Sequence, residues 1–188
     1  AKNELDGMSR VWGHARISRA QKLDIFNACV INRLTYNLHS LWLNTAENRR
    51  LDAFYLQCLR QVLRTPPSYY SRVSNIEVLR RAGDVPKLSS VLLERQLTFM
   101  GMLASRPADD ILKQSIFQNT NGVLEPKVTA GSRRRGRPKM SWSNGVFRHA
   151  MAAAGDRESL DAMWKRTPAA QAAWKRTIHQ YCHPESSS

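Results

Sequence analysis

Apolar residues recur along this chain every three or four positions, the spacing that places them on one face of an α-helix. The clearest stripe begins at Leu51 and ends at Leu63, with apolar positions separated alternately by three residues and by one. Asn44 and Glu47 precede this stripe as a capping pair. Pro66-Pro67 follows it, and neither proline can donate a helical hydrogen bond. The pattern predicts an amphipathic helix between these two signals.

Other helices are predicted from the same period and from their start signals. Ser18 and Gln21 form a capping box before a long apolar run, which predicts one helix reaching about Trp42. Ser74 and Glu77 form a similar pair before a shorter helix. Further helices are predicted near residues 86–105, 109–117, 142–154, 159–166 and 168–182.

The helical period disappears between residues 121 and 139, where Gly, Pro, Ser and Arg dominate. No segment alternates apolar and polar residues in the way typical of a β-strand. We therefore expect an all-α fold. Its expected parts are a helical bundle over residues 1–118, a basic extended linker over 119–140 and a small C-terminal helical unit over 141–188.

Charge then points to a class of partner. The chain has 29 Lys and Arg against 15 Asp and Glu, which gives a formal net charge of +14. Such an excess repels itself unless a polyanion neutralises it, so we expect a nucleic acid, with RNA favoured and DNA open. A generic basic surface is the alternative. A membrane partner is disfavoured, because no predicted helix has a purely cationic face opposite bulky apolar residues and no apolar run reaches 18 residues.

The three cysteines have neither metal-ligand nor disulfide-like spacing. Cys29 and Cys58 fall on predicted apolar helix faces, which favours small buried side chains in a reducing intracellular compartment. An organelle such as the mitochondrion and the nucleus both stay open. The chain begins at Ala1, so a processed product and a fragment stay open as well.

The predicted linker holds the densest cationic cluster. It contains Arg133, Arg134, Arg135, Arg137 and Lys139, which surround Gly136 and Pro138. Guanidinium groups bind phosphate through paired hydrogen bonds, and Gly lets the backbone approach closely. The segment also matches the core of an AT-hook, a peptide that lies in the DNA minor groove. A flexible basic linker or a localisation signal is the alternative.

Other cationic residues are predicted to support this contact. From helix faces these are Arg49, Arg50, Arg60, Arg64, Arg80 and Arg81. The string Trp-Lys-Arg-Thr occurs at Trp164 and again at Trp174, where Lys175 and Arg176 follow the aromatic residue. Aromatic residues interleaved with cations are typical of proteins that bind single-stranded RNA. The favoured alternative is that the tryptophans pack in the core and leave the cations in solvent.

No catalytic, cofactor or metal site is predicted. Asp109 and Asp110 could suggest a metal-binding aspartate pair, but their position before an amphipathic run favours a helix cap. His179, Cys182 and His183 could suggest a metal site, but only three ligands are clustered and no second pair stands at zinc spacing. The chain lacks GxxxxGK[ST], GxSxG and HExxH.

Several strings, in order, resemble the region beyond the palm domain of non-LTR (LINE-type) retrotransposon reverse transcriptases. They span about residues 15–178 and comprise residues 23–36, 49–54, 58–63, 78–83, 134–139 with Trp142-Ser143, and 172–176. The resemblance implies thumb and post-thumb helices, which grip the template and primer without performing chemistry. The palm motif of an aromatic residue followed by Ala-Asp-Asp is absent, because Pro107 takes the aromatic position.

The expected function is therefore a non-catalytic RNA-binding structural protein within a larger ribonucleoprotein, such as a ribosome, and not an enzyme. One alternative is a C-terminal fragment of an active reverse transcriptase. Another is a subunit that scaffolds protein–protein contacts in a large assembly.

Overall fold

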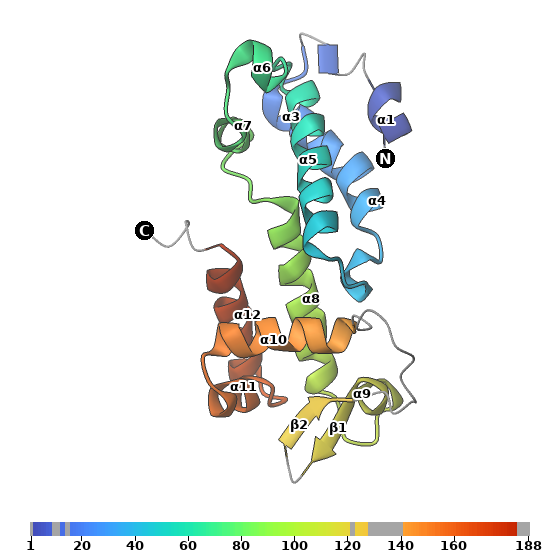
Figure 1. Cartoon of the computed structure of the whole chain (residues 1–188), viewed down its shortest axis with the longest axis vertical. Helices are drawn as coiled ribbons and strands as arrows, with labels where there is room; N and C mark the ends of the chain where they lie inside the picture. The colour runs from blue at the N-terminus through green and yellow to red at the C-terminus, as the bar shows by residue number, and fades with distance from the viewer. Residues whose placement is uncertain (1, 9–11, 14–15, 121–122, 128–140, 184–188) are drawn as a thin grey trace. The chain divides into compact units, whose positions relative to one another are not determined.

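A computed structural model describes residues 2–8, 12–13, 16–120, 123–127 and 141–183 (Figure 1). Helices account for most of these residues, and the predicted all-α class is confirmed, with one small two-stranded sheet added. None of the helices in the described ranges is long and apolar enough to cross a membrane.

The helical elements up to the middle of the chain are α1 (Lys2–Gly7), α3 (Arg19–Phe26), the π-helical turn η1 (Asn27–Ile31), α4 (Asn32–Thr35), the 3₁₀ turn η2 (Leu38–Ser40), α5 (Thr45–Val62), α6 (Ser68–Ser71), α7 (Asn75–Arg81) and α8 (Leu88–Ala104). The remaining elements are α9 (Ile111–Ile116), β1 (Phe117–Thr120), β2 (Val123–Pro126), α10 (Trp142–Ala154), α11 (Arg157–Met163) and α12 (Pro168–Cys182).

Two of the three predicted capping boxes are confirmed. Ser18 caps α3 and Asn44 caps α5, and in each case the side chain three residues further on returns the hydrogen bond. Ser74 also caps α7 by accepting a hydrogen bond from the Glu77 backbone N–H. The Glu77 carboxylate, however, accepts hydrogen bonds from two arginines instead of reaching back to Ser74. Competition with these cations explains why the third box is incomplete.

The single long helix predicted between Ser18 and Trp42 is wrong. The α3 helix passes into η1, and the helical path ends with α4 at Thr35. Asn37 then takes a left-handed backbone conformation with φ of 57°, which Asn adopts more readily than most residues. A π-helical turn holds more residues than an α-helical turn and so changes which residues face the core. Cys29 in η1 is accordingly exposed, contrary to the prediction that it is buried.

The chain forms two compact units, whose boundary lies at Leu92–Leu93 within α8. Unit 1 comprises residues 1–38 and 43–92, and unit 2 comprises residues 39–42 and 93–188. The predicted bundle over 1–118 is therefore divided in the structure. The reason is that apolar residues from the later turns of α8 belong to the same buried cluster as residues of α10, α11 and α12.

The core of unit 1 is built around α5, which contacts α3 and α7. Phe26 from α3, Leu59 from α5 and Val78 from α7 are fully buried in it. The rings of Phe26 and Tyr55 stack with their centroids 6.1 Å apart, and burial raises the pKa of Tyr55 to about 12. The Asp52 carboxylate ties α5 to the first turn of α8 by accepting hydrogen bonds from the Ser89 N–H and hydroxyl at 2.8 and 2.7 Å.

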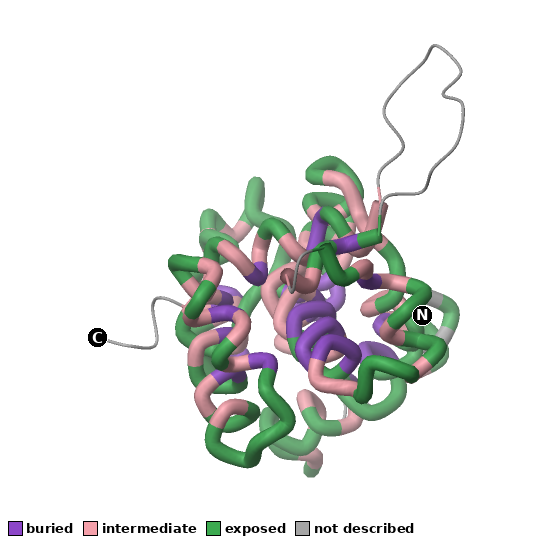
Figure 2. Tube along the Cα trace, turned by 90° about the horizontal axis from the view of Figure 1, so that it is seen from below, coloured by how far each residue is buried: buried purple, intermediate pink, exposed green. Residues whose placement is uncertain are grey.

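The core of unit 2 is aromatic and depends on two glycines. A Cβ atom on Gly101 of α8 would lie 2.1 Å from Nε1 of Trp174, and one on Gly145 of α10 would lie 2.6 Å from the ring of Trp42. These approaches are closer than any side chain permits, so each glycine makes room for an indole ring. Figure 2 shows the buried and exposed stretches along each helix.

A β-hairpin in unit 2 corrects the prediction that the chain has no strands. The strands β1 and β2 pair antiparallel, with Phe117 opposite Pro126 and Thr120 opposite Val123. Phe117 is buried against Trp164, and the Arg157 side chain donates a hydrogen bond to the Leu124 carbonyl. Residues 123–126 therefore belong to a folded element and not to the linker predicted over 119–140.

Candidate nucleic-acid interface

Unit 1 presents several of the predicted cationic residues to solvent. Arg49 and Arg50 are exposed in the early part of α5, and Arg64 is exposed just beyond its C-terminal end. Arg64 adopts a left-handed backbone with φ of 53°, where the chain leaves the helix before Pro66. These guanidinium groups are open to solvent, and their contact with a nucleic acid stays a prediction from the sequence.

Arg60 has a different position from its neighbours on α5. Its guanidinium donates hydrogen bonds to the Pro66 carbonyl at 3.2 Å, the Val73 carbonyl at 2.7 Å and the Asn75 side-chain oxygen at 3.1 Å. These three bonds brace the segment that leads from α5 to α7. Arg60 was predicted to contact nucleic acid, but in the structure its donors are engaged by acceptors of its own unit, among them the Val73 carbonyl.

Arg80 and Arg81 are exposed but share one anionic partner. Glu77 accepts hydrogen bonds from Arg80 at 2.7 and 2.9 Å and from Arg81 at 2.8 Å. These hydrogen bonds lower the pKa of Glu77 to about 2. The three side chains together carry a single net positive charge, so this pair offers a nucleic acid less charge than the sequence alone suggested.

A pair of exposed tyrosines was missed by the sequence reading. Tyr69 and Tyr70 in α6 are 78% and 76% exposed, and their ring centroids lie 4.6 Å apart at 42°. The α6 helix has only four residues and ends at Ser71, and the next residue, Arg72, has a left-handed backbone with φ of 52°. Exposed aromatic rings beside cationic residues are the surface on which unpaired bases stack. The signal in the sequence was two adjacent tyrosines between Pro66-Pro67 and an arginine.

Unit 2 uses its aromatic residues differently. Trp164 and Trp174 are both 5% exposed, and their rings meet edge to face with centroids 6.1 Å apart. The alternative that these tryptophans pack in the core is therefore confirmed, and they offer no surface for base stacking. Lys175 and Arg176 remain exposed on α12, where they line a shallow surface hollow with Ala172, His179 and Gln180.

Of the two aspartates before α9, Asp110 caps the helix, as predicted. Asp110 is the N-cap, and its carboxylate accepts hydrogen bonds from the backbone N–H of Leu112 at 2.9 Å and of Lys113 at 3.2 Å. It also accepts one from Arg106 at 2.8 Å, and this bond is the largest reason that the pKa of Asp110 lies below its usual value. Both contacts give the carboxylate a structural role.

The structure adds a glutamate to the histidines near the C-terminus. Nε2 of His183 lies 3.0 Å from one Glu94 oxygen, and Nδ1 of His179 lies 3.5 Å from the other. Cys182, grouped with these histidines in the sequence, is buried and is not a member of the cluster. Glu94, His179 and His183 could hold a metal ion, although no metal site was predicted.

The predicted linker residues lie outside the described residues. They are Arg133, Arg134, Arg135, Gly136, Arg137 and Lys139. Their contact with a nucleic acid stays a prediction from the sequence. No family model, curated protein or solved structure matches this chain. The relation to LINE-type reverse transcriptases likewise remains a proposal that rests on the ordered strings in the sequence.

Proposed function

We propose that this chain is a non-catalytic RNA-binding protein derived from the thumb region of a LINE-type reverse transcriptase, working within a larger ribonucleoprotein such as a ribosome. The observation that carries the proposal is the exposed Tyr69–Tyr70 pair in a segment bounded by Arg64 and Arg72, all within unit 1. The net charge of +14 supplies attraction to a polyanion, and the tyrosines supply a surface for bases.

Single-stranded RNA fits this surface better than a duplex. In a duplex the faces of the bases are stacked on one another, so a protein aromatic ring reaches them only at loops, bulges and ends. Tyr69 and Tyr70 are adjacent and tilted by 42° relative to each other, which offers two ring faces to neighbouring bases. The surrounding arginines would hold the phosphates that connect those bases.

The positions of the carboxylates support a non-catalytic role. Asp110 and Asp156 cap helices, Asp52 holds the start of α8, and Glu77 pairs with two arginines. Each of these groups is engaged by donors of its own chain. Transfer of nucleotides requires carboxylates that gather around metal ions.

The test measures RNA affinity by fluorescence anisotropy for the full chain and for Tyr69→Ala/Tyr70→Ala. Loss of stacking on one base costs about 1–3 kcal/mol, so we expect single-stranded RNA to bind roughly 5- to 150-fold more weakly. Tyr36→Ala is the matched control, because Tyr36 is 77% exposed in the same unit but lies just after α4, outside the Tyr69–Tyr70 pair. The control should bind like the unmodified chain.

Three other outcomes would redirect the proposal. Tighter binding to an RNA–DNA hybrid duplex than to single-stranded RNA would favour a fragment of an active reverse transcriptase. RNA binding that is equal in all three proteins would refute the tyrosine surface. Complete absence of RNA binding would leave the scaffold alternative, for which the exposed apolar residues Ile111 and Leu112 on α9 would be the first contact to examine.

A further inference from the structure

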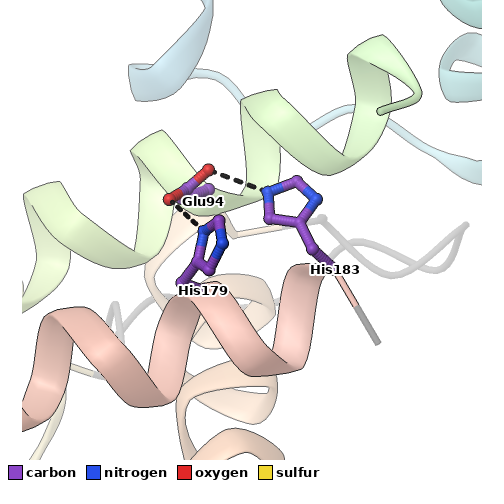
Figure 3. Close-up of side chains that lie close together, drawn as sticks. All are labelled: Glu94, His179 and His183. Atoms are coloured by element: carbon purple, nitrogen blue, oxygen red, sulfur yellow. Dashed lines mark hydrogen bonds and ion pairs between the residues drawn. The ribbon is translucent and has the colours of Figure 1, made fainter. Parts of the chain in front are cut away.

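Two helices of unit 2 bring together a carboxylate and two imidazoles. Figure 3 shows Glu94 of α8 facing His179 and His183 at the C-terminal end of α12. All of the potential ligand atoms lie within 4.8 Å of one another. The two imidazole rings have their centroids 4.8 Å apart and are inclined at 53°. Side chains from two separate helices thus converge on one small volume.

The helical backbone explains why the histidines converge. His179 and His183 are four residues apart, so they lie on the same side of α12, one turn from each other. The His183 backbone N–H donates to the His179 carbonyl at 2.9 Å, which continues the helical geometry to the second histidine. Both rings can therefore act on the same ion.

Packing elsewhere in unit 2 sets the distance from α12 to α8. The indole N–H of Trp174 donates to the Leu97 carbonyl at 3.3 Å, and the same ring lies over Gly101. Ile178 and Cys182 are buried along the same helix. Because these contacts do not involve the cluster, the fold places Glu94 opposite the histidines without help from an ion.

We propose that Glu94, His179 and His183 form a zinc site with three protein ligands and a fourth position open to solvent. Zinc bonds to nitrogen and oxygen of about 2.0–2.1 Å in tetrahedral geometry separate neighbouring ligand atoms by about 3.3 Å. In the structure His183 Nε2 lies 3.0 Å from one Glu94 oxygen, His179 Nδ1 lies 3.5 Å from the other, and the ligand atoms of the three residues lie within 4.8 Å of one another. Small side-chain rotations would suffice to admit the ion.

The ligand set selects among metals. Two imidazoles and one carboxylate suit Zn²⁺, whereas Mg²⁺ and Ca²⁺ prefer sites made of oxygen atoms. Cys182 does not add a soft ligand, because its side chain is buried in the core of unit 2 and is not a member of the cluster.

Exposure supports the open fourth position. The His183 side chain is almost buried, but that of His179 is 60% exposed and borders the surface hollow described above. Water can reach an ion held beside His179. A zinc ion with three protein ligands and water in the fourth position is the arrangement found in sites that exchange ligands.

The experiment is calorimetric titration of Zn²⁺ into the full chain and into His179→Ala, His183→Ala and Gln180→Ala. We expect one zinc ion per chain, and a loss of affinity of at least about 100-fold in each histidine variant, because each loses a direct ligand. Gln180 is exposed between the two histidines, so its variant should bind zinc like the unmodified chain. Mg²⁺ should give no saturable heat.

A further variant distinguishes zinc binding at this site from zinc binding at the exposed Cys29 thiol. Cys29→Ser should keep the zinc affinity of the unmodified chain. The proposal is overturned if zinc binding disappears in Cys29→Ser, if it persists in both histidine variants, or if the unmodified chain takes up no zinc. In the last case the three side chains form only a hydrogen-bonded cluster, and His183→Ala would lower the Tm equally with and without zinc. The outcome does not depend on RNA binding.

Discussion

The two units place similar sequence patterns in opposite environments. In unit 1, Tyr69 and Tyr70 stand beside an arginine and remain in solvent, whereas in unit 2 the rings of Trp164 and Trp174 are buried beside exposed cations. For the tyrosines and Trp174 the difference follows from the helix that carries them, whereas Trp164 lies just beyond the C-terminal end of the seven-residue α11. The α6 helix has four residues and no buried residue, while α12 has fifteen residues and buries one face.

This comparison shows that a motif of aromatic and cationic residues does not by itself define a binding surface. On a helix long enough to have a buried face, the aromatic residue at the right spacing joins the core and its cationic neighbours turn to solvent. The one-turn helix α6 has no buried residue, so its two tyrosines stay available to a ligand. For these tyrosines and Trp174, the length of the helix is therefore more informative than the motif.

Among the changes that test the difference between the two units, Trp174→Ala should have the largest effect on stability. Removal of a buried tryptophan leaves a cavity and costs about 3–5 kcal/mol. Chemical denaturation followed by circular dichroism measures the loss. Tyr70→Ala is the matched change in unit 1 and should alter the unfolding free energy by less than about 0.5 kcal/mol, because the ring is exposed. Equal destabilisation by the two changes would contradict the assignment of the two environments.

A smaller effect is expected from Gly101→Ala in α8. Ala in place of Gly ordinarily stabilises a helix by roughly 0.5–1 kcal/mol. Here the added Cβ would overlap the Trp174 ring, so we expect a net loss of about 1–3 kcal/mol from overpacking. Gly7→Ala in α1 is the control, since nothing lies within 4 Å of its Cβ position. In a thermal melt Gly101→Ala should lower the Tm and Gly7→Ala should raise it. An increase in Tm for Gly101→Ala would refute the close packing.

Two arginines on α5 separate a structural role from a binding role. Arg60→Ala removes three hydrogen bonds within unit 1 and should cost about 1–3 kcal/mol of stability, because the half-buried Val73 carbonyl loses its donor. Arg49→Ala should leave stability nearly unchanged. If Arg49 contacts a phosphate, its loss reduces the slope of log affinity against log salt for single-stranded RNA by about 0.7. Under conditions in which Arg60→Ala is folded, this variant should keep the slope of the unmodified chain. A reduced slope in Arg60→Ala together with an unchanged slope in Arg49→Ala would contradict the division.

The smallest effect concerns pH and His149 in unit 2. Burial, and secondarily the charge of Arg148, lowers the pKa of His149 below its usual value. The unfolded chain therefore binds a proton more readily than the folded chain. The stability contribution of the neutral ring is complete above the unfolded pKa of about 6.5 and falls as the pH drops below it. The free energy of unfolding of His149→Phe, measured from pH 7.5 to 5, should depend less on pH than that of the unmodified chain, and parallel curves would contradict the prediction.

The sequence predicted regular helices well where their ends were marked. The bounds of α10 and α12 agree with the structure, because Gly155 follows the first and Thr167 with Pro168 begins the second. The prediction failed where a local feature interrupted the helical period of apolar residues, as in the π-helical turn after Phe26. The hairpin was missed because its four-residue strands are too short for alternation to be visible, although Asn121-Gly122 between them is the dipeptide most typical of two-residue turns.

The candidate sites were predictable to different degrees. Exposed cations on helix faces follow from the amphipathic pattern, and Arg49 and Arg50 were found in this way. The bracing role of Arg60 depends on carbonyl groups from a loop, whose path no periodicity reveals. Glu94 lies 85 or more residues from the histidines it faces, so only the tertiary packing of α8 and α12 brings it to them.

The most direct test of RNA binding is a salt series on the predicted linker. The affinity of single-stranded RNA is measured across salt concentrations for the unmodified chain and for a variant with Arg133, Arg134, Arg135, Arg137 and Lys139 changed to Ala. Each lost phosphate contact reduces the log–log slope by about 0.7, so the variant's slope should be shallower by about 3. Equal slopes and affinities in the two proteins, or no RNA binding by either, would contradict the account that this linker is the principal electrostatic contact.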